Sequence, residues 1–357
     1  MKRALIAMSG GVDSSVAALL TLRQGTDCVG CTMRLFDNAD APETEGRTCC
    51  SLDDVEDARS VARRMGIPFH VFNFTDDFRR EVMAPFVECY RRGLTPNPCI
   101  DCNRAMKFGR LLRRGEELGC DVLVTGHYAR IEFDGERYRL KKALDPTKDQ
   151  SYVLYMLTQA QLARLRFPLG SLTKARVRSI AEENGFVNAD KPDSQDICFV
   201  PDGDYAAMIR RFTGQELTPG DFVDREGRVL GRHKGIECYT VGQRRGLGVA
   251  LGEPAYVCAV RPADNTVVLG PDEALYSRRV WVPAFHWIAG TPPQGPVRAK
   301  AKIRYRHTER DALVEPTPEG GAVLLFDTPQ RAVTPGQSAV VYDGDEVLGG
   351  GIIAAEE

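Results

Sequence analysis

The sequence has no apolar run that approaches the roughly 20 residues a membrane-spanning helix needs. Its first residues enter an apolar strand pattern at once, which leaves no room for a signal peptide. It also has little net charge, because 47 Lys and Arg oppose 49 Asp and Glu for a formal net charge of −2. We therefore expect a cytoplasmic protein with no membrane partner, in which any contact with a nucleic acid is confined to a local basic patch.

The common P-loop pattern G-x-x-x-x-G-K-[ST] is also absent, which argues against a kinase or a motor ATPase. A different turn, Ser9-Gly10-Gly11-Val12-Asp13-Ser14-Ser15, follows the apolar run 4–8 and precedes a helical pattern. The two glycines let backbone N–H groups approach a polyanion, and the following helix directs its positive end at the same point. Asp13 is placed to hold a metal ion or to cap the turn. We interpret the segment as a phosphate-binding loop, and a simple turn is the alternative.

The first 200 residues alternate between strand and helix patterns. Apolar runs predict strands at 4–8, 28–36, 69–74 and 121–125. Helices are predicted over 76–91, 104–118 and 172–185, and another is opened by a capping box of Ser51 and Asp54. An Asp-Gly turn predicts a hairpin at 133–136. This order indicates a parallel sheet with helices on both faces, whose ligands bind at the carboxyl ends of the strands.

The pattern changes after Gly214 to short β runs with frequent Gly and Pro, and no long helical pattern follows. We infer an α/β domain over 1–205 that carries the phosphate loop. A small β-rich middle domain follows over 206–272, and a C-terminal β-barrel over 273–357.

Eleven cysteines in a chain without a secretory signal argue against a disulfide framework and leave metal, redox or sulfur chemistry open. Cys99 and Cys102 form a Cys-x-x-Cys pair behind two prolines that stiffen the loop. Cys102 lies near the start of a predicted helix with Arg104 close by, and both features stabilise a thiolate. Cys198 lies in another loop and is a third candidate.

Residues 298–306 alternate basic and apolar side chains. On a strand, one face would carry every cation of the run, namely Arg298, Lys300, Lys302, Arg304 and Arg306. Such a stripe suits an RNA phosphate backbone. The alternative is a solvated outer face, although this face has no acid before Glu309.

Seven motifs occur together along nearly the whole chain. They are Ser9–Ser15, Cys49-Cys50-Ser51, Thr95–Asn103, Thr125–Tyr128, Lys148–Tyr152, Ser194–Phe199 and Tyr239–Arg244. In this order they resemble the bacterial tRNA-specific 2-thiouridylases, the MnmA family of the PP-loop ATP pyrophosphatases. The PP-loop alone is shared with GMP, NAD and asparagine synthetases, whereas the cysteine-bearing motifs are more selective.

The resemblance implies a tRNA-uridine 2-sulfurtransferase that acts on the wobble uridine of tRNAs for Lys, Glu and Gln. ATP, used with Mg²⁺, adenylates the C2 oxygen, and sulfur then displaces AMP after pyrophosphate has left. Cys102 would be the nucleophile and Cys198 would carry the persulfide, which leaves a Cys102–Cys198 disulfide for a reductant. The implied partners are tRNA and a sulfur-donating carrier protein or cysteine desulfurase system.

The resemblance also implies individual contacts. ATP would contact Ala7, Met8, Ser9, Gly10, Gly11, Val12, Asp13, Ser14, Met33 and Gly126. The target base would face Asn97, Pro98 and Cys99. The tRNA would contact His127, Lys148, Asp149, Gln150, Arg304, Tyr305 and Gln337. Without the resemblance, His127 would be interpreted as a polar residue at the end of a strand.

Cys99 departs from the family pattern, because many members carry an Asp at this position that is a proposed acid–base group. Two mechanisms are open. In the first, the persulfide relay is intact, and Asp101 or another group transfers the proton in place of the missing Asp. In the second, Cys99, Cys102 and Cys198 ligate a [4Fe–4S] cluster whose fourth iron binds sulfide. The two-residue spacing fits both, whereas zinc lacks a fourth ligand and a His motif.

Two other functions compete with thiolation. A PP-loop ligase that adenylates a small molecule would need neither the basic run nor Cys102 and Cys198. An RNA-binding protein that uses ATP only as a structural switch would release no AMP or pyrophosphate during turnover.

Overall fold

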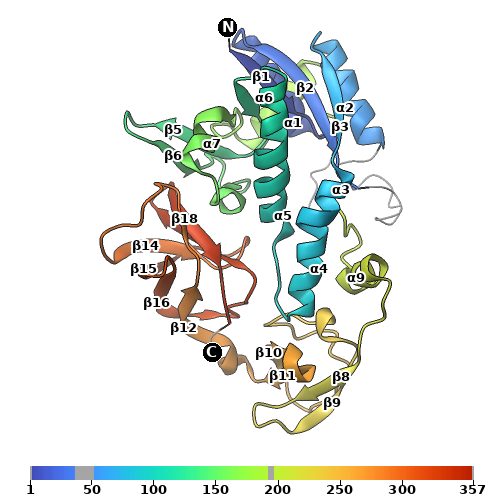
Figure 1. Cartoon of the computed structure of the whole chain (residues 1–357), viewed down its shortest axis with the longest axis vertical. Helices are drawn as coiled ribbons and strands as arrows, with labels where there is room; N and C mark the ends of the chain where they lie inside the picture. Colours follow the sequence, from blue (N-terminus) through green and yellow to red (C-terminus); the bar gives the residue numbers. More distant parts are fainter. Residues whose placement is uncertain (1, 37–51, 192–196, 356–357) are drawn as a thin grey trace.

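The structure is a computed structural model that describes residues 2–36, 52–191 and 197–355 (Figure 1). The Cys49-Cys50 pair, the predicted capping residue Ser51 and the motif residues 194–196 lie outside the described residues.

A parallel sheet forms the N-terminal part. Its strands are β1 (Arg3–Ala7), β2 (Asp27–Arg34), β3 (Phe69–Asn73), β4 (Val122–Val124) and β7 (Leu165–Arg166). Their order is β3-β2-β1-β4-β7, and every neighbouring pair is parallel. The four predicted strands are confirmed, with ends that differ by one or two residues. Because the order reverses between β1 and β4, a ligand crevice is expected at their carboxyl ends.

Side chains alternate between the two faces of this sheet, as the period of a strand requires. Ala4 and Ile6 of β1 join one hydrophobic core, whereas Leu5 between them joins the other. The helices that contribute to the first core are α1 (Val12–Arg23), α2 (Leu52–Arg64) and α8 (Lys174–Glu183). The predicted helix at 172–185 is confirmed, and Gly185 follows it with a positive φ of 61°.

The other face is covered by two long helical segments. One comprises α3 (Thr75–Phe78), the π-helical η1 (Arg79–Met83) and α4 (Ala84–Arg91), close to the predicted 76–91. The second comprises α5 (Pro98–Asp101), the π-helical η2 (Cys102–Leu111) and α6 (Leu112–Glu117). The predicted start at Arg104 was wrong, because Asn97 caps the helix and Pro98 occupies its first position.

Shorter elements complete the N-terminal part. They are the predicted hairpin of β5 (Ala129–Phe133) and β6 (Tyr138–Lys142), the 3₁₀ turn η3 (Ser151–Leu154), α7 (Gln159–Arg164) and α9 (Tyr205–Thr213). Helix α9 packs Met208 and Ile209 into the core that contains Leu5. The helix is capped at its C-terminus by Gly214, which has a left-handed backbone conformation.

A small β-rich region follows. Its sheet has the order β10-β11-β8-β9, with β8 (Gly220–Val223), β9 (Val229–His233), β10 (Tyr256–Arg261) and β11 (Thr266–Gly270). Three 3₁₀ turns lie in or after it: η4 (Ile236–Cys238), η5 (Pro262–Asp264) and η6 (Asp272–Leu275). Phe222, Val257 and Val267 are fully buried in its separate core.

The C-terminal strands form one large antiparallel sheet. They are β12 (Tyr276–Val282), β13 (His286–Trp287), β14 (Val297–Lys302), β15 (Arg310–Pro316), β16 (Ala322–Arg331), β17 (Ser338–Asp343) and β18 (Glu346–Ile352). The order is β12-β16-β15-β14-β17-β18-β6-β5, so the N-terminal hairpin extends the sheet, and Glu346 pairs with Lys141. An α/β part followed by β-rich parts confirms the predicted fold class. Among the described residues, we find no helix with the length and apolar character to cross a membrane.

Candidate active site

The loop after β1 has the shape of a phosphate cradle. Gly10 has a φ of +75°, and a Cβ there would lie 2.4 Å from the carbonyl oxygen of Asp54, so only glycine fits. The Ser9 backbone N–H donates to Ser14 Oγ at 3.1 Å, and that hydroxyl donates to the Gly11 carbonyl at 2.9 Å. The loop is therefore held by its own serines, while Ser9 stays exposed to a ligand.

The end of β4 meets this loop at the point where the strand order reverses. A Cβ on Gly126 would lie 2.9 Å from both the Asp13 carbonyl carbon and the Ser14 backbone nitrogen, so the two backbones approach as closely as glycine permits. Ala7 and Met33 are partly buried beside it, and Met8 and Val12 are buried supports of the loop. The structure thus brings together the residues that the resemblance implies for ATP.

A lysine reaches the loop from a helix far along the chain. Lys174 Nζ lies 2.7 and 2.8 Å from the two carboxylate oxygens of Asp13, and its side chain is only 11% exposed. The Tyr128 hydroxyl donates to Asp13 Oδ1 at 2.7 Å. The sequence shows no lysine after the glycines, yet the fold supplies one at the start of α8.

The back of the loop is braced by the segment after α8. Asn188 Nδ2 donates to the Gly10 carbonyl at 2.8 Å and to Ser15 Oγ at 2.9 Å, and the residue is 2% exposed. Lys191 Nζ lies 2.7 Å from a carboxylate oxygen of Asp54. Sequence reasoning missed Lys174 and Asn188 because each lies more than 150 residues from its partner.

The cysteine pair lies within the first turns of a helix, not in the loop before it. The Asn97 side chain accepts from the Cys99 backbone N–H at 3.2 Å and caps α5. Cys99 is exposed, whereas Cys102 is half-buried at the start of η2, and π-helical turns are common at functional sites. Cys102 and Cys198 pack against the same hydrophobic core as Ala7 and Met33.

The carboxyl group of Asp101 lies between Cys99 and Cys102 in the sequence. Burial raises the pKa of Asp101, and the guanidinium of Arg104, 3.0 Å away, opposes that rise. A carboxyl with a raised pKa beside a thiol is suited to exchanging a proton. Asp101 is the position that the sequence offered in place of the family Asp at 99.

The loop before the cysteines is clamped by both β-rich regions. Gln337 Nε2 donates to the Thr95 carbonyl at 2.8 Å, and the Thr95 backbone N–H donates to the Pro335 carbonyl at 2.9 Å. Thr95 Oγ1 also donates to Thr240 Oγ1 at 3.3 Å. Gln337, which the resemblance implies as a tRNA contact, therefore positions the cysteine loop in this structure.

Tyr305 connects the C-terminal region to the same site. Its hydroxyl donates to the Asp149 carbonyl at 3.4 Å, and its ring packs edge-on against Tyr152 at 5.8 Å. Burial raises the pKa of Tyr305, and the negative charges of Asp149 and Cys99 add to the rise. Tyr305 therefore lies close to Asp149 and to Cys99.

The predicted basic strand was wrong beyond Lys302. Strand β14 ends there, and a turn closed by the His307 N–H and the Arg304 carbonyl at 3.0 Å follows. Arg304 therefore does not continue the stripe. Arg298 makes a bidentate ion pair with Asp327 of β16 at 2.6 and 2.8 Å. Strand β16 lies beyond β15 in the sheet, so an acid from two strands away opposes this face.

His127 is 7% exposed and lies beside Phe108 and Phe167, with ring centroids 5.7 and 5.6 Å away. Burial and, secondarily, Lys107 hold the pKa of His127 well below its usual value. This environment favours the structural interpretation of His127.

The segment 148–150 is partly buried and has internal partners. Asp149 Oδ1 accepts from the Ala143 backbone N–H at 3.0 Å. Gln150 Oε1 accepts from the Tyr128 backbone N–H at 2.9 Å, so it supports the residue that contacts Asp13.

The structure does not assemble the ligands of an iron–sulfur cluster. Within residues 2–36, 52–191 and 197–355, no three His, Cys, Asp or Glu side chains are placed to hold a metal ion. Cys99, Cys102 and Cys198 in this conformation therefore do not fit a [4Fe–4S] cluster.

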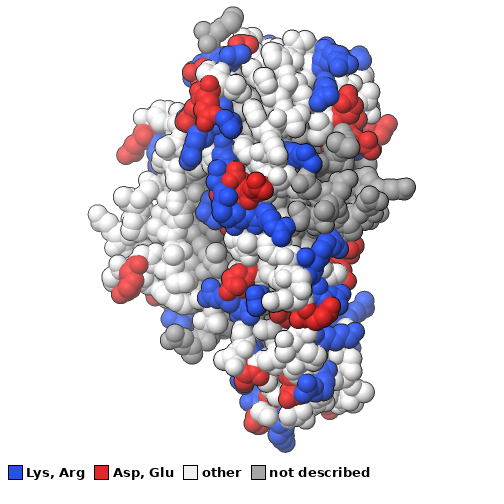
Figure 2. Space-filling view, turned by 45° about the vertical axis from the view of Figure 1, so that its right-hand side comes forward, with Lys and Arg blue, Asp and Glu red and all other residues white. Residues whose placement is uncertain are grey.

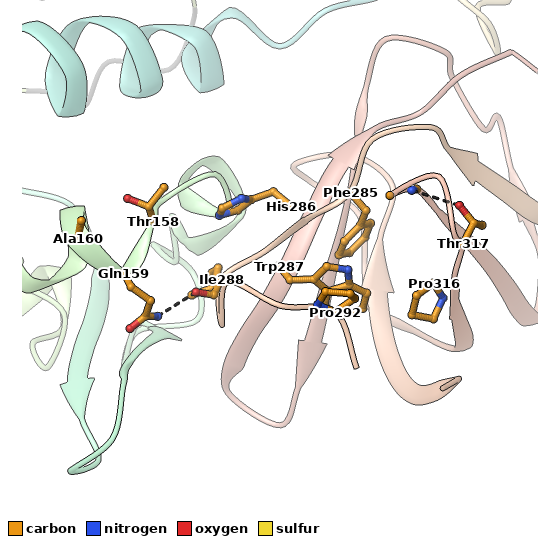
Figure 3. Close-up of a pocket in the computed structure, with 13 residues that line it drawn as sticks. Thr158, Gln159, Ala160, Phe285, His286, Trp287, Ile288, Pro292, Pro316 and Thr317 are labelled. Atoms are coloured by element: carbon orange, nitrogen blue, oxygen red, sulfur yellow. Dashed lines mark hydrogen bonds between the residues drawn. The ribbon is translucent and has the colours of Figure 1, made fainter. Parts of the chain in front are cut away.

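A cavity of about 530 Å³ lies where the start of α7 meets the C-terminal region (Figure 3). Phe285, Trp287 and Pro292 give it an apolar wall, and Gln159 Nε2 donates across it to the Ile288 carbonyl at 2.8 Å. His286 Nε2 contacts the Leu157 carbonyl at 3.0 Å. The cavity shares no lining residue with the phosphate loop or the cysteine helix.

Comparison with known proteins gives the same picture over the whole chain. Residues 2–202 match the tRNA methyl transferase HUP domain, residues 207–271 the tRNA methyl transferase PRC-barrel domain, and residues 277–353 the aminomethyltransferase beta-barrel domain. The chain is 48% identical over 353 residues to the tRNA-specific 2-thiouridylase MnmA of Magnetococcus marinus, with 99% of each chain covered. It is 50% identical over 360 residues to that of Acetivibrio thermocellus, again with 99% of each covered. The chain therefore belongs to the MnmA family of tRNA-specific 2-thiouridylases.

Proposed function

We propose that this protein uses ATP to replace the C2 oxygen of the wobble uridine with sulfur in tRNAs for Lys, Glu and Gln. The observation that carries the proposal is the packing of Cys102 and Cys198 against the core that also contacts Ala7 and Met33 beside the phosphate loop. The names of the relatives, at about half identity over the full length, support the same reaction.

The first step is adenylation. The C2 oxygen of the uridine attacks the α-phosphate of ATP, and the bond to pyrophosphate breaks. The exposed Ser9 and the N-terminus of α1 hold the departing pyrophosphate, and Lys174 balances its charge. Asp13 would hold Mg²⁺, which favours one or two carboxylates together with phosphate oxygens and would neutralise phosphate charge there.

The second step transfers sulfur. The outer sulfur of a Cys198 persulfide attacks C2 and displaces AMP, which leaves the base joined to Cys198 through two sulfurs. The Cys102 thiolate then attacks Cys198 Sγ, so that a Cys102–Cys198 disulfide forms and the outer sulfur stays on C2. A dithiol reductant restores both thiols. Asp101, which precedes Cys102 in the sequence and has a pKa raised by burial, takes the Cys102 proton in this proposal.

The test is thiolation of an unmodified tRNA-Glu transcript by chelator-treated, iron-free protein with ATP and a persulfide donor, measured as retardation in a mercury-containing gel. We expect a retarded band from the wild type and none from Cys102→Ser or Cys198→Ser, while both variants still bind ATP. Cys258→Ser is the matched control, because Cys258 is also half-buried and lies in β10 of the small β-rich region.

Cys99→Asp separates the two sulfur mechanisms. A relay tolerates the change, because Asp is the common residue at this position in the family, whereas a three-cysteine cluster loses a ligand. Activity that appears only after anaerobic iron–sulfur reconstitution, and that Cys99→Asp abolishes, would replace the relay with the cluster.

A further inference from the structure

Another cavity, which is polar and has a volume of about 340 Å³, lies in the C-terminal region beside the turn that carries Tyr305. Its walls come from the start of β12, the turn after β14, the start of β15 and the end of β16. The lining residues are Tyr276, Arg304, His307, Arg310, Thr328, Pro329, Gln330 and Arg331. Three arginines and a histidine thus converge from segments that are separate in the sequence.

Charge in this cavity is of one sign. No Asp or Glu is among its lining residues in the described part of the chain. Asp272 pairs with Arg331 from outside, with oxygen to Nε and Nη2 distances of 2.9 and 2.8 Å. Arg304 donates to the Arg331 carbonyl at 3.1 Å, which neutralises no charge. No lining acid therefore opposes the three arginines, and Asp272 pairs with Arg331 alone from outside the cavity.

His307 brings a buried polar atom to this cavity. Its Nδ1 atom is buried and has no hydrogen-bond partner within the described residues. Burial and the charges of Arg304, Arg310 and Lys302 lower the pKa of His307 to about 4, and a contact with the Gln330 side chain opposes this shift. An anionic oxygen would accept a hydrogen bond from this ring and offset the repulsion among the cations.

We propose that this cavity binds one phosphate of the RNA backbone next to the nucleotide that is modified. The assignment rests on the proposed function. Arg304 lines the cavity, while the adjacent Tyr305 faces Asp149 and lies near Cys99. A base held at Tyr305 would therefore place a neighbouring phosphate on the other side of the same turn. His307 and Arg310 become phosphate contacts that the sequence motifs did not indicate, and the buried Gln330, whose amide donates to the Thr328 carbonyl at 2.6 Å, supports the wall.

Size and surroundings agree with this ligand. A volume of about 340 Å³ lies at the lower end of small-ligand sites, about 300–1,000 Å³, and accommodates a phosphate with part of its ribose. The face of the molecule in Figure 2 shows Lys and Arg interspersed with Asp and Glu, in keeping with the net charge of −2. RNA affinity on such a surface depends on local clusters of cations.

The test uses Arg310→Gln in the full-length protein, because Arg310 is exposed and lines the cavity without contacting the cysteine helix. Binding of a labelled tRNA-Glu transcript is measured by fluorescence anisotropy over a range of salt concentrations. Loss of one phosphate contact should weaken binding about tenfold and reduce the log–log salt slope by about 0.7–0.9. Arg278→Gln, an exposed arginine of β12 outside the cavity, is the matched control and should change neither.

A second arm locates the phosphate. Single neutral methylphosphonate linkages are placed through the anticodon loop of the transcript. One linkage next to the wobble uridine should weaken binding to the wild type but not to Arg310→Gln, since the contact is already lost there.

Each other result would overturn the assignment. Unchanged binding by Arg310→Gln rejects the cavity, and an equal loss in Arg278→Gln shows a diffuse basic face instead. Stabilisation by inorganic phosphate at constant ionic strength, lost in Arg310→Gln while its tRNA slope is unchanged, would assign the cavity to free phosphate. Failure of the wild type to bind tRNA would reject the proposed function together with the cavity, whereas the other outcomes leave thiolation intact.

Discussion

Replacing Lys174 with methionine should destabilise the N-terminal part measurably. The change removes the ammonium that contacts both oxygens of Asp13 and keeps a side chain of similar length. Breaking a fully buried pair costs about 3–5 kcal/mol, and an exposed pair is worth about 0–1 kcal/mol. Lys174 and Asp13 are 11% and 30% exposed, and the Tyr128 hydroxyl stays on the carboxylate, so we expect a loss of about 2 kcal/mol.

A double-mutant cycle tests the origin of this loss. In the Asp13→Asn, Lys174→Met double variant no charge is left without its partner, so the cost should fall below that of Lys174→Met alone. We expect a coupling energy of about 1–2 kcal/mol between the two positions. Thiolation and ATP binding should stay impaired in the double variant, because the phosphate contact of Lys174 is absent in both.

Urea unfolding should be followed by far-UV circular dichroism, because the long helices lie in the N-terminal part. Tryptophan fluorescence would report elsewhere, since both tryptophans, Trp281 and Trp287, lie in the C-terminal strands. Additive costs in the cycle, or a loss under about 0.5 kcal/mol for Lys174→Met, would refute the argument that this pair is a structural part of the loop.

Three further outcomes are expected. Gly126→Ala should weaken ATP binding at least tenfold in calorimetry, because its Cβ would meet backbone atoms of Asp13 and Ser14 at 2.9 Å; wild-type affinity would contradict the close approach. Asp101→Asn should slow thiolation about 100-fold and remove the acidic limb of the pH–rate profile, while the affinity for ATP stays the same. An unaltered pH–rate profile would exclude Asp101 as the base. The pKa of His307 is about 4 in the folded protein, which is below its value of about 6.5 in the unfolded chain. The stability that the neutral ring contributes is therefore complete above about pH 6.5. About 1–2 kcal/mol of the free energy of unfolding is lost as the pH falls from 6.5 to 4. Thermal unfolding of His307→Gln should lack this part of the pH dependence, and an identical pH dependence in both proteins would show that His307 does not titrate in this way.

The sequence was sufficient for features that depend on local patterns. The parallel strands and the phosphate loop follow from apolar runs and glycines within a few residues of each other. The earlier start of the cysteine helix was also readable, because Asn97 followed by Pro98 is a typical helix beginning. Lys174 at Asp13 was not readable, since only packing of α8 beside α1 brings the two together.

The same limit explains the error in the basic run. Alternation along 298–306 is a local pattern, and it correctly predicts a strand as far as Lys302. The ion pair between Arg298 and Asp327 depends on the order of the strands in the sheet, because β15 lies between β14 and β16, and the two residues are 29 positions apart. The charge that a strand presents therefore cannot be counted from its own residues alone.

The hairpin β5–β6 has a consequence for how the protein can be divided. It pairs with β18, so the last strand of the chain depends on a segment about 200 residues earlier. A C-terminal fragment produced alone would expose the edge of β18, which is a template for association with other chains. Pairing over such a separation also forms slowly, because a long loop must close first. During synthesis, the hairpin must therefore wait for the whole chain before its partner strand exists.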